Sequence, residues 1–200
     1  MKIIKSILQY IYSIYGFIIF VFVLLLIFPF VLISLLFGKT NSGNFVYILC
    51  RIWADIAFFL WGFHHKNIFE FPVNKQHACV YVFNHISYMD IPVLMKTFRN
   101  QNIRILAKAS MGSIPIFGVL YRAAAIMVDR SSAKARANSI KELKDTLDKN
   151  ISVVIAPEGT FNTTDCALKS FYDGAFKIAI ETQTPIVPVI FPDNYNRMHY

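Results

Sequence analysis

The feature that most constrains this chain is a run from position 6 to position 38 that contains no charged residue and no histidine. As one helix, the run would be about 50 Å long, whereas the hydrocarbon core of a bilayer is only about 30 Å thick. A secretory signal fits poorly, because its apolar region spans about 7–15 residues and ends at a small-residue cleavage site. We therefore expect the segment to stay in the mature protein and to associate with a membrane.

Two arrangements of this run are possible. One is a single tilted span, and the other is a helix broken near Pro29 whose halves enter one leaflet and return. Basic residues flank the run on both sides: Lys2, Lys5, Lys39, Arg51 and Lys66. Because lysine and arginine concentrate on the cytoplasmic side of membrane segments, this pattern favours the form with both ends at the cytoplasmic face.

A second apolar stretch covers residues 44–63. It predicts either a surface helix packed on the next domain or an amphipathic helix lying in the membrane interface. Arg51 and Asp55 are four residues apart within it and are expected to pair on one helical face.

Charge and cysteine content narrow the function classes. The net charge is +8, from 20 Lys and Arg against 12 Asp and Glu, and beside an apolar segment this favours anionic lipid over nucleic acid as a partner. The three cysteines, Cys50, Cys79 and Cys166, are too few and too widely spaced for a disulfide framework or a metal site. With 200 residues, we expect a membrane-docking helical segment over 1–66 and one globular domain over 67–200.

The globular part alternates short β-rich runs with helical patterns, which is typical of an α/β domain. Helices are expected over 132–150, where apolar residues recur at spacings of three and four, and over 169–182. Strands are expected at 78–83, 103–107, 124–128, 152–156 and 185–191.

His85 follows the first expected strand, and Asp90 lies where a helix is expected to begin. On one continuous helix these side chains would be about 140° apart, and on one strand about 16 Å apart. Only a strand–turn–helix corner brings them together, so that Asp90 could orient the imidazole as a general base. The alternative is an ordinary histidine beside a helix-capping aspartate.

The chain has no Gly-x-Ser-x-Gly nucleophile motif, and nothing marks Ser87 as a nucleophile. The activated hydroxyl would then belong to a substrate. We expect direct transfer rather than a covalent enzyme intermediate, because the nearby Cys166 has no paired histidine in the sequence.

Another strand end runs into Glu158, Gly159 and Thr160, at the edge where parallel sheets bind ligands. Glycine allows close backbone approach, while the carboxylate and hydroxyl offer polar contacts. The alternative is an ordinary turn. Three cations near other strand ends could line a phosphate site: Lys108, Arg122 and Arg130. Gly118 lies in an apolar loop that would suit an acyl chain.

Four ordered blocks resemble a known family. They are Asn84-His85-x-x-x-x-Asp90, Pro115-x-x-Gly118 leading to Asp129-Arg130, Pro157-Glu158-Gly159-Thr160 and Pro185-Ile186-Val187-Pro188-Val189. In this order, across about residues 78–191, they are similar to the 1-acylglycerol-3-phosphate (lysophosphatidate) acyltransferase family. The apolar N-terminus also resembles the membrane-docking helices of its bacterial members.

The resemblance implies a mixed sheet flanked by helices, at the cytosolic face of the inner membrane. It implies acyl transfer from acyl carrier protein or coenzyme A to the sn-2 hydroxyl of a lysophospholipid, 1-acylglycerol-3-phosphate, without a metal or cofactor. His85 would be the base and Asp90 its orienting group. Substrate-binding roles fall to Asn84, Ser87, Lys108, Gly118, Arg122, Arg130, Glu158, Gly159 and Thr160.

One departure bears on the acceptor. Members that act on lysophosphatidate commonly have arginine directly after Glu-Gly-Thr, and here that position is Phe161. Either Lys108, Arg122 or Arg130 contacts the phosphate, or the acceptor is another lysolipid, such as an amino-acid lipid. The same base would also suit a lipid hydrolase, and the same fold would suit a non-catalytic lipid-binding protein. Members usually continue past the last block, so a C-terminal portion after Tyr200 that completes the sheet edge is expected to be missing.

Overall fold

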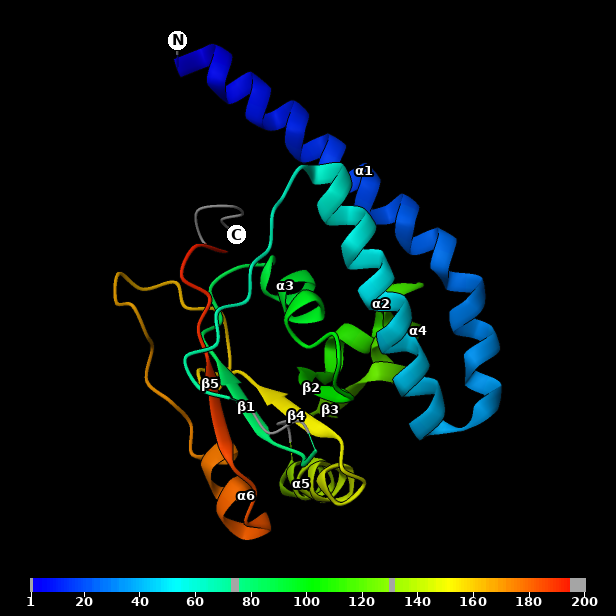
Figure 1. Ribbon diagram of the computed structural model, residues 1–200, viewed down its shortest axis with the longest axis vertical. Coiled ribbons are helices and arrows are strands. Elements are labelled where there is room, and N and C mark those ends of the chain that lie inside the picture. Colours follow the sequence, from blue (N-terminus) through cyan, green and yellow to red (C-terminus); the bar gives the residue numbers. More distant parts are fainter. Residues whose placement is uncertain (1, 73–75, 130–131, 195–200) are drawn as a thin grey trace.

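The computed structural model describes residues 2–72, 76–129 and 132–194. Figure 1 shows two long helices at the N-terminus that lie beside a sheet with helices on both faces. The N-terminal part of the first helix extends beyond the second helix and the rest of the molecule.

The two N-terminal helices are joined by a sharp reversal at Gly38. Helix α1 (Lys2–Ser34) continues through Pro29 and ends in a short 3-10 turn, η1 (Leu35–Phe37), before α2 (Lys39–Trp61) begins. The expected break near Pro29 is therefore wrong. Gly38 has φ 76° and ψ 159°, a conformation that only glycine adopts readily, so the chain turns there.

Aromatic side chains join α1 to α2 through their polar ends. The indole of Trp53 donates to the carbonyl of Phe20 at 3.3 Å, and that of Trp61 donates to the carbonyl of Gly16 at 3.1 Å. The hydroxyl of Tyr12 donates in the opposite direction, to the carbonyl of Trp61, at 2.5 Å. These bonds satisfy the polar atoms of the rings while their apolar surfaces pack between the helices. Both helices are long and apolar enough to cross a membrane.

Helix α2 packs against α3 (Asp90–Thr97) and α4 (Phe117–Ala124), as expected for a helix docked on the next domain. The expected pairing of Arg51 with Asp55 is wrong. Asp55 instead binds Lys96 and Arg99, while Arg51 donates to the carbonyl of Gln101. α3 and the turn after it lie against this face of α2. Lys96 and Arg99 therefore reach Asp55 across the interface and pair with it in place of Arg51.

All four strand pairings in the described residues are parallel, so the expected mixed sheet is corrected to a parallel one. The order across the sheet is β3-β2-β4-β1-β5. Each connection crosses a face of the sheet through helical structure, and this returns the chain in the same direction. The strands are β1 (Val80–Phe83), β2 (Ile103–Lys108), β3 (Ala125–Val128), β4 (Ser152–Ile155) and β5 (Ile186–Val189).

The sheet is buried on both faces because alternate side chains of each strand point to opposite sides. Val80 and Val153 pack with α5 (Ala133–Asp148) and α6 (Gly174–Thr182), whereas Tyr81 and Val154 belong to the core shared with α2 and α3. Figure 1 shows α5 and α6 on one side of the sheet and α2, α3 and α4 on the other.

Helix α6 begins later than expected, at Gly174, so residues 169–173 belong to the preceding loop. A short 3-10 segment, η2 (Ala109–Ser113), lies between β2 and α4. Because the strands are parallel, their carboxyl ends and the loops that follow them gather at one edge of the sheet.

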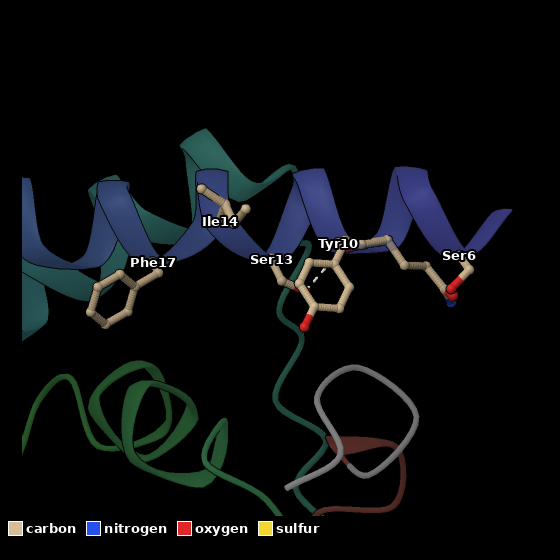
Figure 2. Close-up of a pocket in the computed structure, with 6 residues that line it drawn as sticks. Ser6, Tyr10, Ser13, Ile14 and Phe17 are labelled. Atoms are coloured by element: carbon tan, nitrogen blue, oxygen red, sulfur yellow. Dashed lines mark hydrogen bonds between the residues drawn. The ribbon is translucent and has the colours of Figure 1, made fainter. Parts of the chain in front are cut away.

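The exposed N-terminal half of α1 carries a shallow recess (Figure 2). Its six described lining residues include no carboxylate, imidazole or thiol: Ser6, Gln9, Tyr10, Ser13, Ile14 and Phe17. Ser13 donates to the carbonyl of Gln9 at 2.9 Å, within the helix itself. The recess therefore offers apolar and aromatic surface rather than reactive groups.

Candidate active site

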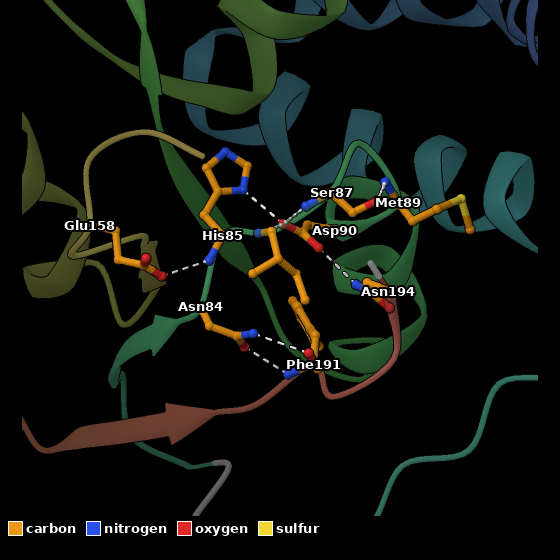
Figure 3. A network of polar contacts seen from close by, with 9 residues as sticks. Asn84, His85, Ser87, Met89, Asp90, Glu158, Phe191 and Asn194 are labelled. Carbon is orange, nitrogen blue, oxygen red and sulfur yellow. Dashed lines mark hydrogen bonds and ion pairs between the residues drawn. The ribbon is translucent and has the colours of Figure 1, made fainter. Parts of the chain in front are cut away.

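His85 and Asp90 lie at a corner between β1 and α3. β1 ends at Phe83, and α3 begins at Asp90, so a six-residue turn places both side chains at the carboxyl edge of the sheet. The His85 Nδ1 lies 2.8 Å from the Asp90 Oδ2, as Figure 3 shows. The expected strand–turn–helix geometry is confirmed.

The carboxylate of Asp90 is wholly buried and receives hydrogen bonds at both oxygens. Its Oδ2 accepts from the backbone N–H of Ile86 at 2.9 Å and of Ser87 at 3.1 Å, besides the imidazole. Its Oδ1 accepts from the side-chain amide of Asn194 at 2.8 Å. This set of donors stabilises a charged carboxylate and fixes its orientation.

The arrangement defines which nitrogen of His85 is available for chemistry. A carboxylate accepts hydrogen bonds, so Nδ1 carries the proton directed at Asp90 and Nε2 retains its lone pair. The imidazole is 20% exposed, while the carboxylate beneath it is not exposed at all. Figure 3 shows Nε2 on the side of the ring turned away from Asp90. The ring can therefore accept a proton at an accessible atom.

Glu158 holds the backbone of this corner against the loop after β4. The carboxylate is 1% exposed. Its Oε1 accepts from the backbone N–H of His85, and its Oε2 accepts from the backbone N–H of Lys169, each at 3.0 Å. The carbonyl of His85 in turn accepts from the N–H of Asn162 at 2.7 Å. The backbone of His85 is thus held on both sides by one loop.

Asn84 and Ser87 use their side chains inside the protein. The amide of Asn84 donates to the carbonyl of Phe191 at 3.0 Å and accepts from its N–H at 2.8 Å, which joins β1 to the segment after β5. The buried hydroxyl of Ser87 accepts from the N–H of Met89 at 3.0 Å. Both residues support the corner, and their contact with substrate stays a prediction.

The ring of Phe161 covers one face of the imidazole. The centroids of the Phe161 and His85 rings are 4.0 Å apart, with the planes inclined by 32°. Tyr88 meets the same phenyl ring nearly edge-on, at 5.0 Å between centroids. The residue that stands where family members commonly carry arginine therefore makes an apolar wall beside the candidate base.

Gly159 and Thr160 lie in the same loop. Gly159 has φ 72°, in the left-handed region that glycine tolerates best, and its N–H closes a turn onto the carbonyl of Ala156 at 3.0 Å. The hydroxyl of Thr160 accepts from Nζ of Lys169 at 3.0 Å. Substrate contacts of Glu158, Gly159 and Thr160 stay predictions, although all three belong to the loop that contacts the backbone of His85 through Glu158.

Three other predicted binding residues, Lys108, Gly118 and Arg122, belong to β2 and α4 rather than to the two loops that hold His85 and Glu158. Lys108 is exposed at the carboxyl end of β2, on the same edge of the sheet. Arg122 donates to the carbonyl of Gly112, and a Cβ at Gly118 would lie 2.3 Å from that same oxygen, so this apolar loop is tightly closed on itself. Arg130 lies outside the described residues.

Sequence reasoning missed two polar groups of the site. Asn194 is separated from Asp90 by 104 positions, and a lone asparagine gives no signal of such a contact. The apolar periodicity of α6 extends back over Lys169 and therefore predicts a helix there. In the structure, Lys169 lies in the loop before α6. Its backbone N–H donates to Glu158, and its side chain donates to Thr160.

Residues 64–192 match the sequence model of a family described as Acyltransferase. The chain belongs to this family. The matched segment begins after the end of α2 and continues past β5, so it contains both loops that form the site.

The chain is also similar in sequence to named proteins. The chloroplastic 1-acyl-sn-glycerol-3-phosphate acyltransferase BAT2 of Brassica napus is 30% identical over 80% of this chain and 45% of its own length. The 1-acyl-sn-glycerol-3-phosphate acyltransferase of Helicobacter pylori is 33% identical over 79% of this chain and 65% of its own length. The chain thus spans between about half and two thirds of the length of these relatives.

The fold also matches a solved structure. The crystal structure of the 1-acyl-sn-glycerophosphate acyltransferase PlsC from Thermotoga maritima superposes with a TM-score of 0.67. That match covers 94% of this chain and 74% of the other, at 22% identity. At this identity, the match establishes a shared fold, including the N-terminal helices.

Proposed function

We propose that this protein transfers an acyl chain from an acyl thioester to the sn-2 hydroxyl of 1-acylglycerol-3-phosphate, forming phosphatidate. The observation that carries the proposal is the buried Asp90 carboxylate bonded to Nδ1 of a part-exposed His85. Membership of the Acyltransferase family and the names of the relatives support the reaction class and the acceptor.

The reaction follows from the two nitrogens of His85. Nε2 takes the proton of the acceptor hydroxyl as its oxygen attacks the thioester carbonyl carbon. The tetrahedral intermediate then collapses, the carbon–sulfur bond breaks, and the thiolate leaves with the proton returned by the imidazolium. Asp90 stabilises the imidazolium through its 2.8 Å hydrogen bond, so no further base is needed.

Direct transfer between substrates is favoured over a covalent enzyme intermediate. The Ser87 hydroxyl is buried and accepts a backbone hydrogen bond. Cys166 is exposed, and the structure pairs it with no histidine among the described residues. The nucleophile is therefore assigned to the lipid acceptor.

The N-terminal helices support a location of this reaction at a membrane. Helices α1 and α2 supply long apolar surfaces, and α2 packs on α3, the helix that carries Asp90. A lysolipid dissolved in the bilayer would reach the site from this side. We place the domain at the cytosolic face of the inner membrane, where acyl carrier protein or coenzyme A thioesters are available as donors.

The test uses the purified full chain in lipid vesicles with a labelled acyl thioester. Labelled phosphatidate that forms only when lysophosphatidate is added supports the proposal. Release of labelled fatty acid at the same rate with and without lysophosphatidate would instead identify a hydrolase. Each of the two donors is tried with lysophosphatidate and with lysolipids of other headgroups.

A further inference from the structure

We propose that Lys169 holds the phosphate of the acceptor lysolipid, an inference that rests on the acyltransferase function proposed above. The acceptor hydroxyl must reach Nε2 of His85, and in 1-acylglycerol-3-phosphate the phosphate is attached to the adjacent carbon. A cation close to the His85 corner is therefore required. Residue 161, the first after the Glu-Gly-Thr turn, is a phenylalanine stacked on the imidazole and offers no charge.

The backbone of Lys169 is fixed relative to His85 by a single buried group. Oε2 of Glu158 accepts from the N–H of Lys169, and Oε1 accepts from the N–H of His85, each at 3.0 Å. The two residues are thus neighbours in space, although they are far apart in sequence. Because Glu158 is 1% exposed, this link is shielded from water and holds the loop rigidly.

The side chain of Lys169 is placed for an anionic ligand. Its Nζ donates to the neutral hydroxyl of Thr160 at 3.0 Å. In the described part of the chain, no carboxylate lies within ion-pair distance of this ammonium. An ammonium has three donors, so two remain for a ligand, and the Thr160 hydroxyl can turn its own proton toward a phosphate oxygen.

Four other cations of the described residues are bound elsewhere, and Lys108, which is exposed at the carboxyl end of β2, lies outside the two loops that form the site. Arg99 and Lys96 bind Asp55, and Arg122 donates to the carbonyl of Gly112. Arg104 bonds the start of α2 through the carbonyl of Thr40 and the side chain of Asn44. Lys169, by contrast, lies close to His85, because the Glu158 carboxylate accepts hydrogen bonds from the backbone N–H groups of both residues.

A lysine contact differs chemically from an arginine fork. The ammonium is a compact charge on a flexible stem, whereas a guanidinium binds phosphate through two parallel hydrogen bonds. Position 161 is then free to carry the aromatic ring that packs on His85. The site keeps a positive charge for the phosphate but supplies it from a residue eight positions later.

The experiment measures initial rates for the full chain in vesicles, with the wild type compared with Lys169→Ala and Lys169→Arg. Alanine keeps the backbone N–H that Glu158 accepts, so the loop is preserved. The matched control is Lys177→Ala, which removes an exposed lysine of α6. The inhibition constant of 1-acylglycerol, which lacks the phosphate, is measured as a competitor of lysophosphatidate in each variant.

We expect Lys169→Ala to raise the KM for lysophosphatidate about tenfold or more, as loss of a charge-assisted hydrogen bond predicts. The inhibition constant of 1-acylglycerol stays unchanged, Lys169→Arg retains most of the affinity, and Lys177→Ala behaves as the wild type. An unchanged KM, an equal loss for both lipids, or a rise in the KM for the thioester instead would overturn the inference. A wild type that acylates no lysophosphatidate would overturn the proposed function itself.

Discussion

Asn194 donates a hydrogen bond from its side-chain amide to Oδ1 of Asp90, at 2.8 Å, and both side chains are buried. Asp90 belongs to the first turn of α3, whereas Asn194 follows β5, the last strand of the sheet. The segment after the last strand therefore contributes directly to the group that orients the candidate base.

Asn194→Ala is expected to lower kcat while it leaves the KM for both substrates nearly unchanged. Loss of the amide leaves Oδ1 of Asp90 buried without this donor, which costs about 1–3 kcal/mol. Only the part of this cost that arises in the transition state lowers kcat, and at about 1.4 kcal/mol per factor of ten the loss in kcat is at most about 5- to 150-fold. Asn67→Ala, at an exposed asparagine, is the control. Equal effects of the two substitutions on kcat would contradict a positioning role.

Glu158→Gln is expected to reduce both stability and kcat. The amide retains one oxygen, so one of the two backbone N–H groups, of His85 or Lys169, loses its acceptor and faces an NH₂ group. We expect the free energy of unfolding to fall by about 1–3 kcal/mol in denaturant titrations. Glu181→Gln, which removes only an exposed ion pair with Lys144, is expected to change it by less than about 1 kcal/mol.

Stability at alkaline pH is expected to depend on Tyr81. Burial raises the pKa of this phenol to about 12, from 10.0, while its hydroxyl donates to Gln101 at 2.6 Å. The folded state therefore holds the proton more tightly than the unfolded chain, so this contribution is complete below about pH 10 and is lost as the pH rises to about 12.

Tyr81→Phe tests this dependence by denaturant unfolding at several pH values. The variant is expected to be less stable at neutral pH by about 0.5–1.5 kcal/mol, because it lacks the hydrogen bond to Gln101. Between about pH 10 and 12 its stability is expected to fall less steeply than that of the wild type. Parallel pH profiles for the two proteins would show that Tyr81 does not titrate in this range.

Membrane binding is expected to depend on the exposed apolar face of α1. Leu26→Arg places a charge on a side chain that is 53% exposed, and a charge near the centre of a bilayer costs about 2.5–3.5 kcal/mol. We expect a smaller fraction of this variant to sediment with vesicles of uncharged phosphatidylcholine. Ile140→Arg introduces the same charge on α5, across the sheet, and is expected to sediment as the wild type. Equal sedimentation of the two variants would rule out insertion of this face.

The local elements and the His85–Asp90 corner could be predicted from the sequence, because both depend on short-range patterns. Strand positions follow from apolar runs between turn residues, and the corner is the one local geometry that brings residues five apart together. The relative direction of the strands could not be predicted in the same way. An all-parallel sheet depends on how the helical connections cross its faces, which the pattern within each strand does not encode.

Contacts between distant segments were not predictable in the same way. The bonds of Glu158 to His85 and Lys169, and of Asn194 to Asp90, join loops that meet only after the sheet is assembled. The partners of Asp55 show the same limit. A spacing of four residues on a helix predicts that Asp55 pairs with Arg51. In the structure, α2 packs on α3, and Asp55 pairs with Lys96 and Arg99 instead.

The most direct test of the account is the rate of phosphatidate formation by purified His85→Ala, beside the wild type and a fold control such as circular dichroism. Loss of general-base catalysis is expected to lower this rate by about 10²- to 10⁴-fold without loss of the fold, because Nε2 of His85 takes the acceptor proton. A folded His85→Ala protein that forms phosphatidate at the wild-type rate would contradict the account.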